Sequence, residues 1–293
     1  MVEDLDDQLQ EKENNQEVHV VTHSSGNHAA ALALAAKLGS AKTGQNIRST
    51  IVMPDNAPTI KVNGVKGFGG DIVLVESTNE AREEMADQIV EEQDASFIHP
   101  SEDPRVIAGQ GTVSVEFIEQ MKEMTCHDSK INASIVDAII IPVGGGGLAA
   151  GNTIALRGLL GNNVKIILAE PEEMDDAKRS KEAGVLLGHD PTNKLKSVAD
   201  GLKTTLGPNT WPIVRDLVDD IITVSEKDIL CATKIIWERL KVCIEPSAGV
   251  GVAVAMGKKF KEKYPSLDKV GIILCGGNVD IVKTAKLMDK ISA

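Results

Sequence analysis

Four consecutive glycines, Gly144 to Gly147, are the residues of this chain best suited to binding chemistry. They follow the apolar run 138–143 and open onto the small-residue segment 148–151. When a buried strand ends in bare backbone just before a helix, free N–H groups and the positive end of the helix dipole point at one spot, which suits an anion. We therefore expect this turn to hold a phosphate group.

A glycine run can also be a flexible linker or a plain strand-to-helix turn. The flanks here are strand-like and helix-like rather than serine-rich, which favours a bound phosphate. No Gly-Lys-Ser/Thr follows, so the run is not a Walker loop. A dinucleotide site is the weaker candidate, because the run does not spell Gly-x-Gly-x-x-Gly with an acidic residue ending the next strand.

Two further turns place small or polar residues at a helix start, at residues 22–28 and 275–278. Each could be only a helix cap, since Ser and Asn are preferred there. Three such turns in one chain favour a ligand site over three separate caps.

The elements that must position these turns alternate along the chain. Strands separated by helices predict an α/β fold with parallel sheets covered on both faces. Ligands in such folds bind at the carboxyl ends of the strands, often between two domains. The predicted strands are 18–22, 50–53, 72–75, 138–143, 164–169, 221–224 and 270–275; the predicted helices include 27–38, 59–67, 79–92, 111–124, 226–242 and 247–264.

The alternation of predicted strands and helices is interrupted near residues 100–135. We predict a poorly ordered acidic lead-in over 1–18, a small α/β domain over 19–113 and a large α/β domain over 114–293. The site is expected between the two domains.

Composition narrows the function classes. The 293 residues are 42% hydrophobic and carry a net charge of -12, with no basic stripe, so nucleic acid and membrane are not expected partners. Aromatic residues make up only 2%, which argues against base-stacking surfaces. The four cysteines, Cys126, Cys231, Cys243 and Cys275, show no zinc-like spacing, and no signal peptide precedes them. A reducing, cytoplasmic compartment is therefore expected.

The motifs of this chain, in order, resemble those of the fold-type II pyridoxal phosphate enzymes, and within them the serine racemase and serine/threonine dehydratase group. The resemblance covers nearly the whole chain. It is carried by Ser24-Ser25-Gly26-Asn27-His28, His99-Pro100, Ala108-Gly109-Gln110-Gly111-Thr112, the four glycines, Ala169-Glu170-Pro171, Ala199-Asp200-Gly201, Thr210-Trp211-Pro212, Glu245-Pro246 and Cys275-Gly276-Gly277-Asn278-Val279-Asp280.

The resemblance implies a cofactor, pyridoxal 5′-phosphate. Its phosphate would be bound by Gly144, Gly145, Gly146 and Gly147 with the backbone amide of Leu148, its 3′-oxygen by Asn27, and its pyridine nitrogen would face Cys275. A neutral thiol there would leave the ring less electron-withdrawing than an Asp would. Without the resemblance, the sequence would indicate only that Cys275 is an ordinary small buried residue.

The resemblance also implies substrate residues. Ser25 would be the acid/base on the face of the α-carbon opposite the lysine, and racemisation needs a group on each face. Threonine dehydratases commonly carry Ala there, so Ser25 favours serine racemisation. Ser24, Arg82 and Asp200 would contact substrate, although Arg82 could equally be a helix-surface residue.

A divalent cation site is implied at Glu170, the carbonyl of Met174 and Asp176. Hard oxygen ligands suit Mg²⁺ or Ca²⁺. Spacing alone would favour an ordinary surface carboxylate cluster. ATP as an activator is in doubt, because Ala30 replaces a polar residue associated with nucleotide binding in some relatives.

One departure concerns the Schiff-base lysine, which the family carries in a Phe-Lys-x-Arg-Gly-Ala-like segment upstream of the Ser-Ser-Gly-Asn-His turn. The only lysine before Ser25 is Lys12, and it matches nothing in that motif. The family's lysine is therefore not present, and the N-terminal part of the large domain is expected to be missing.

The function implied is a dimeric serine racemase, converting L-serine to D-serine, with β-elimination to pyruvate and ammonia as a side activity. A truncated or lysine-less pseudoenzyme that binds cofactor or metal without turnover is the alternative. An unrelated phosphate-binding α/β protein is a third reading, at the level of fold alone.

Overall fold

The structure is a computed structural model that describes residues 17–125, 135–192 and 196–292. The chain divides into two compact units, Met1–Val106 and Ile107–Ala293. The boundary falls near the start of helix α5 (Pro104–Thr125), and the predicted division after residue 113 falls inside the same helix. Most of the predicted lead-in, residues 1–16, lies outside the described residues.

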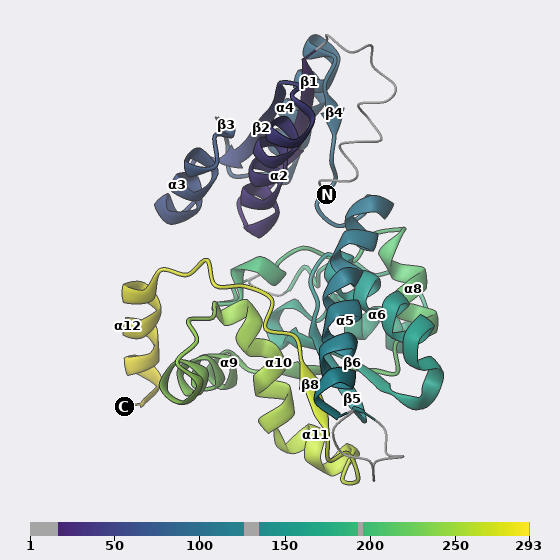
Figure 1. The fold of residues 1–293 in the computed structure, drawn as a ribbon. Coiled ribbons are helices and arrows are strands. Elements are labelled where there is room, and N and C mark those ends of the chain that lie inside the picture. The colour runs from purple at the N-terminus through teal and green to yellow at the C-terminus, as the bar shows by residue number, and fades with distance from the viewer. Residues whose placement is uncertain (1–16, 126–134, 193–195, 293) are drawn as a thin grey trace. The chain divides into compact units, whose positions relative to one another are not determined.

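The first unit is built on a four-stranded parallel sheet of order β3-β2-β1-β4 (Figure 1). Val18 pairs with Ile47 and Val20 with Ser96, which sets the register on either side of β1. The elements are β1 (Val18–His23), α2 (Asn27–Thr43), β2 (Ile47–Pro54), α3 (Thr59–Gly67), β3 (Asp71–Val75), α4 (Asn79–Gln93) and β4 (Ser96–Phe97).

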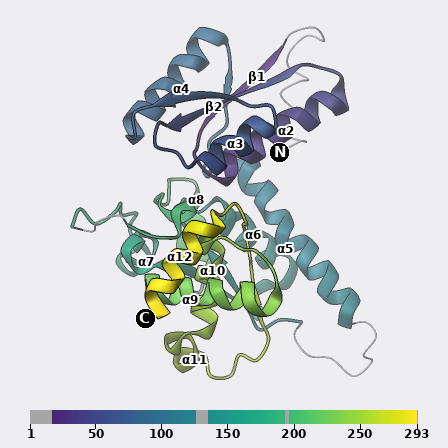
Figure 2. The same ribbon diagram turned by 90° about the vertical axis from the view of Figure 1, so that its left-hand side faces the viewer.

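Helices cover both faces of this sheet because successive side chains of a strand point to opposite faces. Val20 packs with Leu32 of α2 in one buried cluster, whereas Val21 packs with Ile89 of α4 in another. Figure 2 shows α4 on one side of the sheet and α2 and α3 on the other. The near-continuous apolar strands are typical of a doubly covered parallel sheet.

The second unit holds another four-stranded parallel sheet, of order β7-β6-β5-β8. Three of its strands, β5, β6 and β8, are labelled in Figure 1. Its strands are β5 (Ala138–Pro142), β6 (Lys165–Pro171), β7 (Asp220–Val224) and β8 (Val270–Ile272). Its helices are α6 (Gly147–Leu160), α7 (Asp176–Ala183), α8 (Thr210–Leu217), α9 (Glu226–Ile235), α10 (Pro246–Met256), α11 (Lys258–Lys263) and α12 (Ile281–Ser292), with the main part of α5.

The alternation of side chains again builds two cores. Ile140 packs with Val250 of α10 on one face, and Ile141 packs with Leu156 of α6 and Val214 of α8 on the other. The predicted α/β class with two parallel sheets is confirmed.

Two glycines let α5 and α6 cross at close range. A Cβ on Gly151 would lie 2.0 Å from the carbonyl oxygen of Ile107, and one on Gly111 would lie 2.7 Å from that of Gly151. Beside this crossing, the fully buried Asn152 accepts a hydrogen bond from the Ser114 hydroxyl (2.6 Å) and donates to the carbonyls of Gln110 (3.1 Å) and Leu148 (2.8 Å). The first turn of α6 is thereby tied to α5.

Several elements differ from their prediction. The predicted helix 226–242 is α9 followed by a π-helix, Ile236–Leu240, which ends at Lys241 with a φ of 60°. The predicted helix 247–264 is two helices separated at Gly257. The last strand stops at Ile272 rather than at residue 275. Within the described residues, no helix has the length and apolar character needed to cross a membrane.

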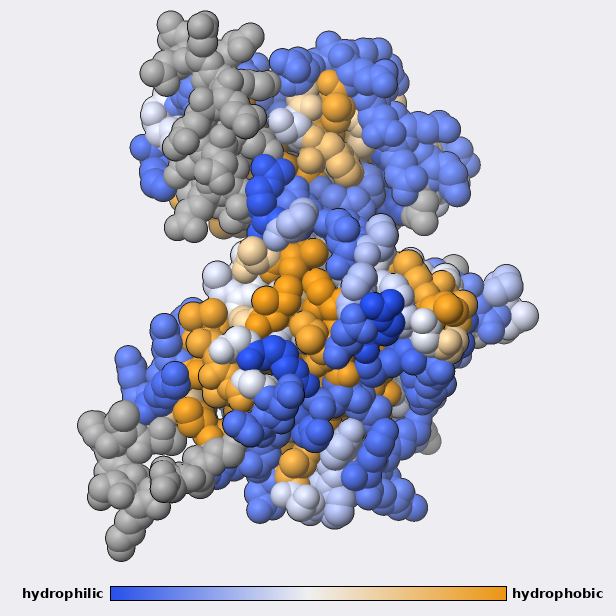
Figure 3. All heavy atoms as spheres, turned by 90° about the vertical axis from the view of Figure 1, so that its right-hand side faces the viewer, coloured by the Kyte–Doolittle hydropathy of each residue, from blue (hydrophilic) through white to orange (hydrophobic). Residues whose placement is uncertain are grey.

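Apolar side chains remain exposed on the second unit. Val113 and Val115 in α5 and Ile154 and Leu159 in α6 are examples. Figure 3 shows apolar side chains gathered on one face of this unit.

Candidate functional site

The glycine turn lies where β5 ends and α6 begins, at the carboxyl edge of the sheet. Gly146 is the N-cap of α6 with a φ of 87°, a left-handed conformation that L side chains rarely adopt. Because the first backbone N–H groups of a helix have no partner within it, those at the start of α6 are available to an anion.

Two threonines that the sequence analysis gave no role hold this turn in place. Gly145 donates its N–H to the hydroxyl of Thr204 (3.1 Å), and its carbonyl accepts from the hydroxyl of Thr210 (3.1 Å). Neighbouring atoms also leave no space for side chains, since a Cβ on Gly144 would lie 2.8 Å from the Cα of Leu202. Sequence spacing gave no signal for Thr204, because the contact spans 59 residues of chain.

The turns that carry Asp200 and Cys275 are joined through the start of α10. Gly201, next to Asp200 in the 3₁₀ turn Asp200–Leu202, donates its N–H to the Ser247 hydroxyl (3.1 Å). Glu245 donates its N–H to the carbonyl of Gly276 (3.0 Å). Since the same 3₁₀ turn packs on Gly144, three of the predicted site segments lie together in this unit.

Cys275 is a free, partly buried thiol. Burial raises its pKa to about 12, and the negative charge of Glu245 acts in the same direction. The thiol is therefore neutral at physiological pH, as a weak partner for a pyridine nitrogen would be.

The remaining cofactor and substrate candidates lie in the first unit. Ser24 and Ser25 lie in the turn between β1 and α2, Asn27 is the first residue of α2, and the Ser24 hydroxyl accepts from the N–H of Gly26 (3.3 Å). The backbone N–H of Ser24 donates to Val52 of β2 (3.1 Å), which continues the sheet into the turn.

Rings that the sequence analysis did not single out as catalytic lie against His23, the residue just before this turn. The ring centroids of His23 and Phe97 lie 5.3 Å apart, and those of His23 and His99 lie 5.8 Å apart. Burial lowers the pKa of His23 to about 4, and the charges of His99 and Arg82 lower it further. Arg82, at the start of α4, donates a hydrogen bond from its Nε to the carbonyl of Thr78 (3.1 Å).

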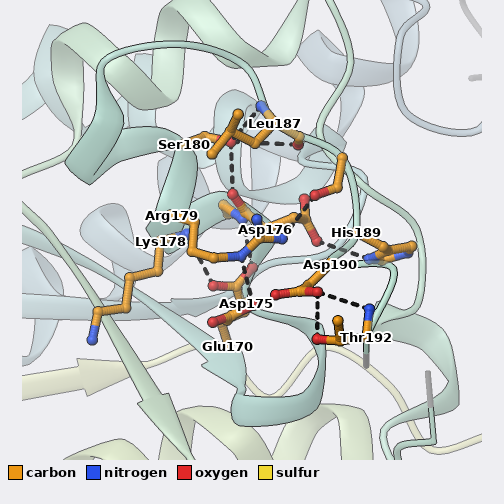
Figure 4. Close-up of polar contacts among 12 residues, drawn as sticks. Glu170, Asp175, Asp176, Lys178, Arg179, Ser180, Leu187, His189, Asp190 and Thr192 are labelled. Atoms are coloured by element: carbon orange, nitrogen blue, oxygen red, sulfur yellow. Dashed lines mark hydrogen bonds and ion pairs between the residues drawn. The ribbon is translucent and has the colours of Figure 1, made fainter. Parts of the chain in front are cut away.

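The predicted cation ligands lie at the end of β6 and the start of α7 (Figure 4). Glu170 is buried, and its Oε1 and Oε2 accept the backbone N–H groups of Ala177 (2.9 Å) and Lys178 (3.0 Å). The Oδ1 of Asp176 lies 3.4 Å from His189 Nδ1. Met174 is buried in the intervening 3₁₀ turn, Glu172–Met174.

These two carboxylates are electrostatically unfavourable neighbours. Burial raises the pKa of Glu170 well above its usual value, and the charge of Asp176 raises it further. Burial likewise raises the pKa of Asp176 to about 6. Across the described ranges no group of three or more His, Cys, Asp or Glu side chains could hold a metal, whereas the predicted set has two carboxylates and a carbonyl.

Comparison with known proteins identifies the class. The family model described as pyridoxal-phosphate dependent enzyme matches residues 1–276, so the chain belongs to that family.

Individual relatives narrow the class. The chain is 43% identical to human serine racemase over 265 residues, covering 90% of this chain and 72% of the relative. It is 43% identical to the serine racemase of Arabidopsis thaliana over 264 residues, covering 89% and 73%. Among solved structures, that of maize serine racemase has a TM-score of 0.81 at 43% identity, covering 92% of this chain and 76% of that one. The predicted resemblance to the serine racemase and dehydratase group is confirmed.

The residues present fit the phosphate and ring of the cofactor. The glycine turn is a cradle that a Cβ would fill, as Gly146 shows: a Cβ there would lie 2.6 Å from Leu206 Cδ2 and 2.8 Å from Thr210 Cβ. The neutral thiol of Cys275 suits a ring nitrogen that stays unprotonated. For the aldehyde, residues 1–24 contain one lysine, Lys12, and its surroundings do not match the family's motif.

Proposed function

We propose that this protein uses pyridoxal 5′-phosphate to convert L-serine to D-serine, with elimination to pyruvate and ammonia as a side reaction. The observation that carries the proposal is the glycine turn, held by Thr204 and Thr210 with Gly146 in a left-handed conformation. Sequence identity to serine racemases over nine-tenths of the chain supports the choice of substrate.

The cofactor would bind through this chain's own groups. Gly144 to Gly147 and the amide of Leu148 would hold the phosphate, Asn27 the 3′-oxygen and Cys275 the pyridine nitrogen. When bound, pyridoxal phosphate withdraws electrons from the α-carbon of an attached amino acid, which makes the α-proton removable. A neutral thiol at the ring nitrogen moderates this withdrawal.

Ser25 would give and take a proton at one face of the α-carbon, while Ser24, Arg82 and Asp200 would bind and orient the substrate. Arg82 supplies a positive charge suited to a carboxylate. Its influence on His23, beside the Ser24–Ser25 turn, supports this role.

Glu170, Asp176 and the carbonyl of Met174 would bind Mg²⁺ or Ca²⁺. Support comes from the raised pKa values of both carboxylates, because two buried acids next to each other favour a cation that neutralises them. Glu170 already caps the start of α7, so its oxygens would serve the helix and the cation together.

Three further properties belong to the same proposal. Exposed apolar side chains on the second unit support a homodimer. Free thiols at Cys231, Cys243 and Cys275 support a reducing, cytoplasmic location. Lys241 and Asn278 are compatible with the nucleotide site of the relatives, so ATP would be an activator only if these two residues suffice without a polar residue at Ala30.

The test is to incubate the purified protein with pyridoxal phosphate, record the visible band of the bound cofactor, and assay L-serine for D-serine and pyruvate. Borohydride reduction with peptide mapping then locates any covalent lysine. A labelled lysine with both products would support the enzyme. Failure to bind the cofactor would contradict the proposal.

A further inference from the structure

Glu245 stands at the N-cap of α10, yet its side chain makes no capping hydrogen bond to that helix. Its Oε2 instead accepts the backbone N–H of Asn278 (3.2 Å), while its own N–H donates to the carbonyl of Gly276 (3.0 Å). One buried residue therefore holds the 275–278 turn from two directions.

The same corner of the chain also reaches the turn that carries Asp200. Ser247 accepts the N–H of Gly201 (3.1 Å), and a Cβ on Gly201 would lie 3.6 Å from Glu245 Oε1. Helix capping does not explain a glutamate here, since Ser, Thr, Asp and Asn are the preferred N-caps. Its carboxylate accepts from the 275–278 turn and lies beside Gly201, while the hydrogen bond to the Asp200 turn comes from Ser247.

We propose that Glu245 is a positioning residue for the cofactor ring: it holds the turn that carries Cys275 by two hydrogen bonds, from the N–H of Asn278 and to the carbonyl of Gly276, and sets a carboxylate near that thiol. The inference rests on the proposed function only for the statement that Cys275 faces the pyridine nitrogen.

The charge of Glu245 gives this arrangement a chemical consequence. A carboxylate near a partly buried thiol opposes ionisation, which adds to the effect of burial on the Cys275 pKa. The pyridine nitrogen would then meet a protonated sulfur rather than a thiolate. A loosened turn would misplace the sulfur even where its protonation state were unchanged.

Two variants separate the hydrogen bond from the charge. Glu245→Gln keeps an acceptor for Asn278 N–H and removes the charge, whereas Glu245→Ala removes both. Glu226→Gln is the matched control, because Glu226 also accepts a backbone N–H, from Val198 (2.6 Å), and a hydroxyl hydrogen bond, from Ser197 (2.7 Å).

The measurements need neither cofactor nor substrate. Iodoacetamide labelling, quantified by peptide mass spectrometry, follows Cys275, with the exposed Cys231 and Cys243 as internal references. Hydrogen–deuterium exchange of peptides spanning residues 275–280 follows the turn.

Glu245→Gln should label Cys275 about 3- to 10-fold faster at pH 8 with exchange in the turn unchanged, since each unit of pKa is about 10-fold in thiolate. Glu245→Ala should also lose about 10-fold in exchange protection, and Glu226→Gln should change neither. Wild-type exchange in Glu245→Ala, or wild-type labelling in Glu245→Gln, would overturn the proposal. Neither experiment uses cofactor or serine, so the proposed function is tested separately by measuring cofactor binding and turnover of serine.

Discussion

The carboxylate of Asp176 accepts a hydrogen bond from the backbone N–H of Leu206, with 3.3 Å between Oδ2 and N. The Leu206 side chain in turn fills the space that a Cβ on Gly146 would need. A single residue therefore connects the candidate cation site with the glycine turn.

Mg²⁺ should stabilise the second unit, and Asp176→Asn should abolish the effect. At a concentration 100-fold above its Kd, a ligand of the folded state adds about 2.7 kcal/mol to the free energy of unfolding. In EDTA the variant should be at least as stable as the wild type, because it removes a negative charge beside buried Glu170. Urea unfolding followed by tryptophan fluorescence measures this unit alone, since both tryptophans, Trp211 and Trp237, lie in it.

Asp190→Asn is the control for the cation experiment. Asp190 lies in the same region but is bonded to the N–H and hydroxyl of Thr192 (2.8 and 2.6 Å). It should retain the full response to Mg²⁺. Equal stabilisation of Asp176→Asn by Mg²⁺ would place the cation elsewhere.

Gly146→Ala should destabilise the second unit and weaken cofactor binding. The left-handed backbone costs about 1–2 kcal/mol for a residue with a Cβ, and the contacts with Leu206 and Thr210 add about 1–3 kcal/mol. Gly158→Ala, in the same helix with open space around it, should be stabilising by up to about 1 kcal/mol. Urea unfolding and titration with pyridoxal phosphate test the pair, and wild-type binding by Gly146→Ala would contradict the phosphate assignment.

Ser114 and Asn152 should show strong coupling in a double-mutant cycle. Ser114→Ala leaves the Asn152 carbonyl oxygen buried without its donor, at a cost of about 1–3 kcal/mol. The double variant Ser114→Ala, Asn152→Leu should lose less than the sum of the single variants, with a coupling of about 0.5–3 kcal/mol. Tryptophan fluorescence in urea measures all four proteins; additive losses would show that the hydrogen bond contributes nothing specific.

The first unit should lose stability as the pH falls from 6.5 towards 4. Burial lowers the pKa of His28 from 6.5 to about 4, with His23, His99 and Asp103 the other titratable groups acting on it. Between pH 6.5 and pH 4 the histidine binds a proton in the unfolded chain but stays neutral in the folded state. The free energy of unfolding is therefore highest above pH 6.5 and decreases as the pH falls through this range. Between pH 7.5 and 5 the loss is about 2 kcal/mol, or about 30-fold in opening.

Hydrogen–deuterium exchange of peptides from α2 measures this loss once intrinsic exchange rates are corrected. His23, whose pKa is also about 4, contributes in the same direction, so the quantity to compare is wild type against His28→Gln. An identical pH dependence in the variant would exclude His28 as the cause.

Ser25→Ala should separate the two reactions of the proposed enzyme. Racemisation needs a proton returned at the face proposed for Ser25, whereas elimination needs removal at the other face only. D-serine formation should fall by about 100-fold or more, with pyruvate formation from L-serine retained. Equal loss of both products would make Ser25 a binding residue instead.

The sequence patterns were sufficient for most of the sheet strands because apolar runs such as 138–143 occur only where both faces of a strand are covered. They did not predict β4, whose two residues are too few for a periodic signal, or the π-helix before Lys241, which has no known composition cue. The predicted strand 270–275 is longer than the observed one, because its last apolar residues lie beyond Ile272, where pairing with β5 ends.

The candidate site likewise contains residues that the sequence indicated and residues that it did not. Glycine composition alone indicated the turn between β5 and α6, and the family motifs suggested cofactor or substrate roles for Ser25, Asn27 and Cys275, which stay predictions. Thr204 and Glu245 were given none, because their contacts with Gly145 and Asn278 join segments 59 and 33 residues apart. Asn152 is a polar residue among the small apolar residues of α6, and this pattern could have indicated its hydrogen bond with Ser114.

The strand order of the second unit fixes when it can fold during synthesis. β5 lies between β6 and β8, and β8 (Val270–Ile272) is the last of these four strands along the chain. The ribosome must therefore release the chain through Ile272 before β5 gains its second neighbour, whereas the strands of the first unit are all complete by Phe97. A nascent chain paused shortly before residue 270 would carry a closed first sheet and a second sheet with β5 exposed at its edge, the state in which a chaperone would find a surface to bind.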